Sequence, residues 1–206
     1  LHGFNYKDVT EIRISKEVIP QIPKVELPKN SDDEYTRIDM LMTAGDECRR
    51  NSSDNSILAL GAAALIAKRN RLAGDDTPRN YRPRHAYIIN SLKHPDEVVQ
   101  LRQIYPLGFY LFGVYAEEKR REDYLFSTKQ IPVEKARNLM KRDEDENTDY
   151  GQRVKDTFHM SDFFVRLDDS QDQLRNSLWR ILDIMFGHPH ETPTFDEYAM
   201  FLAHVA

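Results

Sequence analysis

The chain is short of several features that mark particular classes of protein. Its 206 residues include one cysteine, Cys48, which excludes an internal disulfide and fits a reducing compartment. Apolar runs are too short to cross a bilayer, and the longest, Ile57 to Ala67, is followed at once by Lys68 and Arg69. No secretory signal stands at the start of the sequence. These absences predict a cytoplasmic protein that makes no contact with membranes.

The residues that are present are typical of a well-solvated globular domain. Charged residues make up 31% of the chain and aromatic residues 10%. The mean hydropathy is −0.67. A net charge of −5 gives the chain no overall attraction for nucleic acid, although local basic clusters can still bind anions. The length is sufficient for one well-buried core.

The apolar pattern predicts a doubly wound α/β domain. The expected strands are Val9–Ser15, Arg84–Asn90, Gly108–Tyr115 and Asp162–Leu167. The expected helices are Asp33–Arg50, Asn55–Leu72, Pro95–Tyr105, Glu117–Leu125, Val133–Lys141, Gln171–Phe186 and a last one from Phe195 onward. Strand, helix and strand follow one another between residues 84 and 115, which is typical of a parallel crossover. We therefore expect the three later strands side by side and parallel in one sheet, covered on both faces.

Several segments together resemble one protein family. They are IINSLKHPDEVVQLRQIY (88–105), GFYLFGVYAEEKRREDYL (108–125), RIDMLMTAGDECRR (37–50), KRDEDE (141–146), YGQRVKDTFHMSDFFV (150–165) and TPTFDEYAMFLAHVA (192–206). In this order they are similar to the kinase-like domain of the bacterial deoxycytidylate-deaminase family. That family includes antiphage enzymes that destroy the dCTP pool.

The resemblance implies a phosphate-binding-loop (P-loop) kinase-like domain over residues 1–190 and the start of a zinc-dependent deaminase domain over residues 191–206. The deaminase domain uses an H-x-E and a P-C-x-x-C segment to hold zinc and move protons, and neither occurs here. The loop motif G-x-x-x-x-G-K-[ST] is also absent. We therefore expect the first strand and its phosphate loop upstream of Leu1, and the zinc ligands outside this chain.

By the same resemblance, the full protein converts dCTP or dCMP to dUTP or dUMP, and this part regulates or supports the deaminase. It further implies a deoxynucleotide or ATP-like ligand, magnesium, homo-oligomers and a restraining RNA or protein inhibitor. Two other functions stay open: a genuine nucleoside-monophosphate kinase, and a scaffold that assembles deaminase domains without nucleotide.

The strongest candidate site follows the strand that ends at Asn90, because α/β folds bind ligands where core strands end and helices begin. Ser91, Lys93 and His94 are expected to touch a nucleotide or a neighbouring domain; the alternative is a helix cap with a solvated lysine. Working kinases usually place an acidic magnesium ligand near this strand end. Asn90 is a weak neutral substitute, which argues against efficient phosphoryl transfer.

Several arginines are further candidates for nucleotide binding. Arg120, Arg121, Arg142 and Arg153 are candidates for a cationic lid over phosphates, since planar guanidinium groups suit phosphate geometry. Arg37 and Arg49, with Arg50, lie on the helices where monophosphate kinases hold the acceptor nucleotide. The alternative for these side chains is ordinary solvated charge on helix surfaces.

Two other polar groups favour plain explanations. The acidic run in KRDEDE suits a magnesium ion or a basic partner, but a solvated helix end explains it as well. His188 and His190 flank a proline at a helix stop with no third ligand nearby, which is typical of loop residues rather than a metal site.

Overall fold

The computed structural model describes residues 6, 8–29, 33–72, 84–144, 148–167 and 170–205. Its strands are β1 (Asp8–Arg13), β2 (His85–Asn90), β3 (Phe112–Tyr115) and β4 (Phe163–Arg166). Its α-helices are α1 (Glu34–Ser52), α2 (Ile57–Leu72), α3 (Pro95–Ile104), α4 (Glu118–Ser127), α5 (Val133–Glu144), α6 (Val154–His159), α7 (Gln171–Met185) and α8 (Phe195–Val205). The π-helical turn η1 (Ile14–Val18) and the 3₁₀ turn η2 (Ile19–Gln21) follow β1. The mixed α/β class is confirmed.

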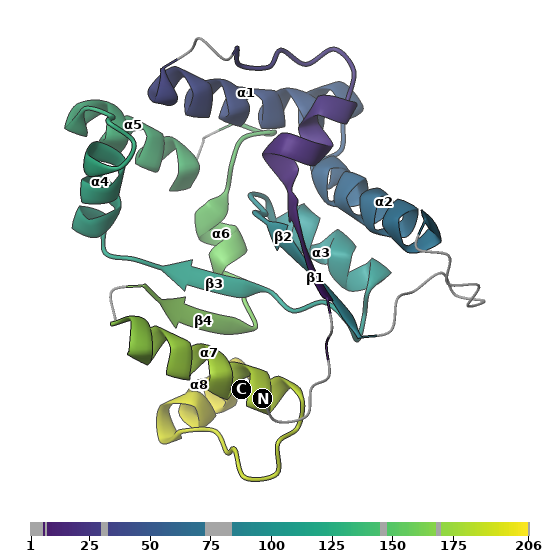
Figure 1. Cartoon of the computed structure of the whole chain (residues 1–206), viewed down its shortest axis with the longest axis vertical. Coiled ribbons are helices and arrows are strands. Elements are labelled where there is room, and N and C mark those ends of the chain that lie inside the picture. Colours follow the sequence, from purple (N-terminus) through teal and green to yellow (C-terminus); the bar gives the residue numbers. More distant parts are fainter. Residues whose placement is uncertain are drawn as a thin grey trace.

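The strands form two separate parallel pairs among the described residues. β1 pairs with β2, placing Ile12 opposite Ile89, and β3 pairs with β4, placing Val114 opposite Val165. The prediction that the three later strands share one sheet is therefore wrong for this part of the chain, since α3 links β2 to β3 across two different sheets (Figure 1).

Local backbone structure explains why two strands begin or end at other residues than predicted. The strand expected from Gly108 begins only at Phe112, because the amides of Gly108 and Phe109 both donate to the carbonyl of Tyr105 and form a turn. The strand expected to reach Ser15 ends at Arg13, and η1 begins at Ile14. The other expected helices and strands are present within a few residues, whereas the short helix α6 was not predicted.

The main core lies between β1, η1, α1 and α2. Ile12, Val18 and Cys48 are buried there against the small residues of α2. Gly61 is required at this contact, because a Cβ added to it would lie 2.4 Å from Val18 Cγ1. A second cluster joins α1 to the α4–α5 hairpin through buried side chains that include Met42 and Leu139. The two clusters anchor α1 on both sides.

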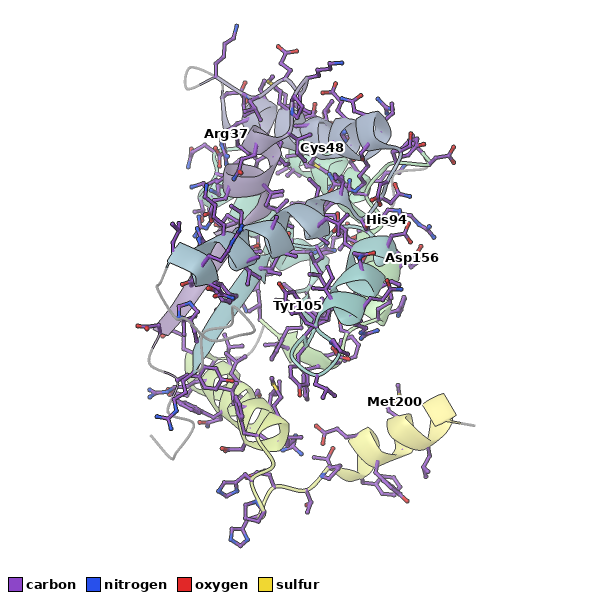
Figure 2. All side chains as sticks on the ribbon, turned by 90° about the vertical axis from the view of Figure 1, so that its right-hand side faces the viewer. Arg37, Cys48, His94, Tyr105, Asp156 and Met200 are labelled. Atoms are coloured by element: carbon purple, nitrogen blue, oxygen red, sulfur yellow. The ribbon has the colours of Figure 1, made fainter. Side chains whose placement is uncertain are left out.

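The C-terminal helix α8 stands apart from this core. Figure 2 shows Met200 on α8 well away from the body of the molecule. The Met200 side chain is accordingly exposed, at 71%. The helix is attached to α7 through Arg180, whose guanidinium nitrogens Nη1 and Nη2 lie 2.6 and 2.7 Å from the Glu197 carboxylate. No helix among the described residues has both the length and the apolar character needed to traverse a bilayer.

Leu101 tests the packing of α3 against the rest of the fold. It is fully buried, whereas Leu107 is 92% exposed. Leu101→Ala leaves a cavity and is expected to lower the free energy of unfolding by about 2–5 kcal/mol. Leu107→Ala, the matched control, is expected to change it by less than about 0.5 kcal/mol. Urea denaturation measures both, and equal effects would contradict this placement of α3.

Candidate functional site

One cavity of about 1080 Å³ lies at the carboxyl ends of all four strands. Its lining includes Arg13 at the end of β1, Asn90 at the end of β2, Ala116 just after β3 and Leu167 just after β4. The strands of both pairs thus point toward the same space, and α1, α4 and α5 lie around it (Figure 1). This is the place where α/β proteins most often hold a ligand.

The charge of the lining is opposite to that of the whole chain. Its eight cationic residues are Arg13, Lys16, Arg37, Arg49, Lys93, Arg120, Arg121 and Lys129. Among the described residues two acids, Glu34 and Asp143, line the same cavity, so the lining taken alone has a formal charge of +6. Carboxylates behind the lining, such as Asp46 and Glu97 beside Arg49, offset part of this charge. The chain as a whole carries −5. Such local concentration of one sign attracts anions from solution.

A buried ion pair forms one wall of the cavity. Arg49 of α1 is 1% exposed, and its Nη2 lies 2.8 Å from Oε1 of Glu97 on α3, which is fully buried. Its Nη1 lies 3.2 Å from Oδ1 of Asp46, one turn earlier on α1. The third nitrogen, Nε, is buried without a hydrogen-bond partner among the described residues. Arg49 is therefore fixed in place by two carboxylates.

Glu97 also shapes the loop between β2 and α3. Its Oε2 accepts hydrogen bonds from the backbone amides of Lys93, at 2.7 Å, and His94, at 3.2 Å. This carboxylate therefore joins three elements: α1 through Arg49, the helix α3 that carries it, and the loop at the end of β2. Together with the side-chain cap of His94 it forms a capping box, which satisfies amides at the start of α3.

Ion pairs hold α5 against α1 and against the loop after β2. Arg142 contacts Asp39, at 2.6 Å, and Asp46, at 2.8 Å, both on α1. Lys93 Nζ lies 2.6 Å from Oδ1 of Asp143. These contacts close the cavity between α1, α5 and the loop after β2.

Glu34 bridges two cavity cations at the start of α1. Its carboxylate accepts hydrogen bonds from Arg37, at 2.6 and 2.8 Å, and from Lys129, at 2.9 Å. The hydrogen bond from Arg37, followed by that from Lys129, lowers the pKa of Glu34 to about 2. The carboxylate therefore stays ionised throughout the physiological range.

The structure brings seven of the ten predicted site residues to the cavity. Asn90, Ser91, Lys93, Arg37, Arg49, Arg120 and Arg121 line it. The other three, His94, Arg142 and Arg153, are not in its lining. The nucleotide-binding roles of all ten residues stay predictions.

The three remaining residues have structural partners. His94 is 2% exposed, its Nδ1 accepts from the amide of Asp96, and burial lowers its pKa. Figure 2 shows His94 on the other side of the molecule from Arg37. Arg142 pairs with the α1 carboxylates, and Arg153 pairs with Asp156 on α6.

Other cavity residues were missed from the sequence. Lys16 follows β1 in a turn that was predicted as strand and loop, and Lys129 follows α4. Gln152 lies in a segment that carries no apolar period, so only its membership in the YGQRV stretch could have drawn attention to it. Spatial convergence, rather than a motif, brings these three together.

The other candidate polar groups do not form a metal-binding cluster in the part of the chain that the structure describes. The described residues hold no cluster of three or more His, Cys, Asp or Glu side chains that could bind a metal ion. In the KRDEDE run, Asp143 pairs with Lys93, and residues 145–147 lie outside the described residues. His188 and His190 are exposed, with ring centroids 5.7 Å apart.

Comparison with known proteins adds no relative, since no family model matches the chain and no curated protein matches its sequence. The resemblance to the deaminase family therefore rests on the sequence segments given above.

Glu97→Gln tests whether the buried ion pair organises the cavity. Because the change leaves Arg49 buried with one carboxylate fewer, unfolding free energy should fall by about 3–5 kcal/mol. Glu122→Gln removes a carboxylate that pairs with Arg137, 62% of whose side chain is exposed, and should cost less than about 1 kcal/mol. Chemical denaturation of both variants checks this, and a cost at Glu97 no larger than at Glu122 would refute it.

The pKa of Glu34 gives a pH prediction. A carboxyl group whose folded pKa lies below its unfolded value stabilises the fold above the unfolded pKa and loses that contribution as pH falls. For Glu34 the window runs from about 4.5 down to about 2. Carboxyl titration by NMR should give a midpoint near 2, and Arg37→Leu should raise it. A midpoint near 4.5 in the unsubstituted protein would show that the Arg37 contact does not form.

Proposed function

We propose that the cavity binds a nucleotide, and that the chain is the kinase-like regulatory part of a deoxycytidylate deaminase. The cationic lining carries this proposal, because eight cations and two acids around a cavity where two parallel strand pairs end suit a polyphosphate. The volume of about 1080 Å³ is ample for a nucleoside triphosphate. In the full protein, hydrolysis of dCTP or dCMP would take place in the zinc domain.

The free strand edges support a further phosphate-binding element. In the part of the chain that the structure describes, β2 pairs with β1 alone and β3 with β4 alone. The family resemblance implies a strand and phosphate loop that precede β1. Both pairs end at the same cavity, so a parallel strand between β2 and β3 would deliver its loop to the cationic lining.

The residues of this chain do not fit the zinc group of the implied deaminase. Such a site needs histidine and cysteine thiolates, and the one cysteine, Cys48, is fully buried in the core with its pKa raised by burial to about 11. A thiol in this state is protonated and inaccessible. We therefore derive no chemical step through zinc for this part of the protein.

Two features weigh on the alternative functions. A monophosphate kinase would need a magnesium ligand near the end of β2, but Asn90 is neutral and its amide donates to Glu11 at 3.1 Å. A scaffold without nucleotide gives no reason for eight cationic side chains to line one cavity. Nucleotide sensing without phosphoryl transfer fits both observations.

Binding of nucleotides tests the proposal directly. We expect dCTP, ATP or dTTP to raise the melting temperature, with affinity that falls as salt is added. Replacing Lys16 and Arg120 by glutamine should weaken binding about tenfold or more, because each charged hydrogen bond contributes about 1.5–3 kcal/mol. Isothermal titration calorimetry measures this loss.

The matched control removes the same charge elsewhere. Lys155 on α6 and Arg175 on α7 are exposed and do not line the cavity. Replacing both by glutamine should leave affinity within about twofold, because neither side chain lines the cavity and salt screens exposed charges. No binding of any nucleotide by the intact protein would favour the scaffold, and equal losses in the two double variants would place the ligand elsewhere.

A further inference from the structure

We propose that Gln152 reads the nucleobase: its carboxamide hydrogen-bonds a base edge that carries an amino group beside a ring nitrogen, as in cytosine or adenine. This inference rests on the proposed nucleotide-binding function and adds to it the residue that distinguishes a base from a bare polyphosphate.

Gln152 is a buried polar side chain whose oxygen has no partner. The residue is 3% exposed, it lines the cavity, and its Oε1 is buried without a hydrogen bond among the described residues. Leaving a buried acceptor unsatisfied destabilises the fold. Sites that carry such a cost are often ones that a ligand completes.

The backbone on both sides holds Gln152 in place. The amide of Gly151 donates to the carbonyl of Thr148 at 3.1 Å, and the amide of Arg153 donates to the carbonyl of Lys93 at 2.8 Å. The second bond fastens the segment to the loop after β2. Figure 1 shows the chain before α6 passing close to α1 and then running down to α6. Gln152 thus lies where the cavity meets the loop of Ser91 and Lys93.

Gln152 and the neighbouring cations suit two different parts of a nucleotide, its base and its phosphates. Phosphate oxygens at neutral pH accept hydrogen bonds, so they suit the cations and cannot satisfy the Gln152 oxygen. An amino group on a base donates to that oxygen, and the amide nitrogen of the same side chain can donate to the adjacent ring nitrogen. Paired contacts of this kind are the ones by which proteins recognise base edges.

The variant Gln152→Leu separates base reading from phosphate binding. In calorimetry with the intact protein, the substitution should weaken the binding of dCTP or ATP at least about fivefold. Affinity for inorganic tripolyphosphate should stay within about twofold. The control Gln103→Leu alters an exposed glutamine outside the cavity lining and should change none of these affinities.

The melting temperature without ligand provides a second readout. Because Gln152→Leu removes an unsatisfied buried oxygen, the ligand-free variant should melt at the same temperature as the parent or higher. A purely structural glutamine would give a lower melting temperature, which would overturn the inference.

The ligand series separates the remaining outcomes. Equal weakening of dCTP and tripolyphosphate would overturn base reading, and so would unchanged affinity for both of them, while nucleotide binding itself would stand. If the parent protein binds tripolyphosphate but no nucleotide more tightly, base reading is wrong. If the parent binds none of the ligands, the proposed function fails, and this inference fails with it.

Discussion

The contact between Arg49 and Glu97 is the interaction on which the rest of the site depends. Both side chains are almost wholly buried, and each makes hydrogen bonds that define an element: Arg49 to Asp46 on α1, and Glu97 to the loop after β2. A buried charge that lacks its partner is costly in free energy. Replacing either residue by a neutral one would therefore destabilise the fold, because the other charge would stay buried with one partner fewer. The pair fixes α1, α3 and the strand end in one arrangement.

The arrangement explains how an acidic protein can present a basic cavity. Several lining cations are paired with carboxylates, some of which, such as Asp46, Glu97 and Glu144, are outside the lining. The cavity keeps its cationic lining while the surface keeps the acidic excess. Within the lining, Glu34 and Asp143 hold Arg37, Lys129 and Lys93 in position. An anionic ligand would meet cations that are already ordered, which reduces the entropic cost of binding.

The sequence predicted the helices and strands well because each carries its own signal. The capping residues Asp33 and Ser170 and the apolar stripes of α3 and α7 are local features. The pairing of strands is not local: nothing in the residues of β3 states that its partner is β4 rather than β2. The single sheet was therefore predicted wrongly from a correct list of strands.

The same distinction governs the site. Asn90 to Lys93 could be placed at a ligand-binding edge because a strand end followed by a helix start is visible in sequence. The buried state of Arg49 was not visible, since Arg49 and Arg50 look alike at a helix end, yet Arg49 is 1% exposed and Arg50 is exposed. Glu97 decides between them, and it lies 48 residues away from Arg49. Gln152 likewise acquires its position only from the fold.

Backbone chemical-shift mapping with isotopically labelled protein and dCTP tests the central claim, that the cationic cavity is a nucleotide site, most directly. The account predicts shifts concentrated at the ends of all four strands, from residues 13–16, 90–93, 116–121, 167 and 170–174. Saturable shifts confined to α8 and the distal end of α2, or no shifts at millimolar nucleotide, would contradict it.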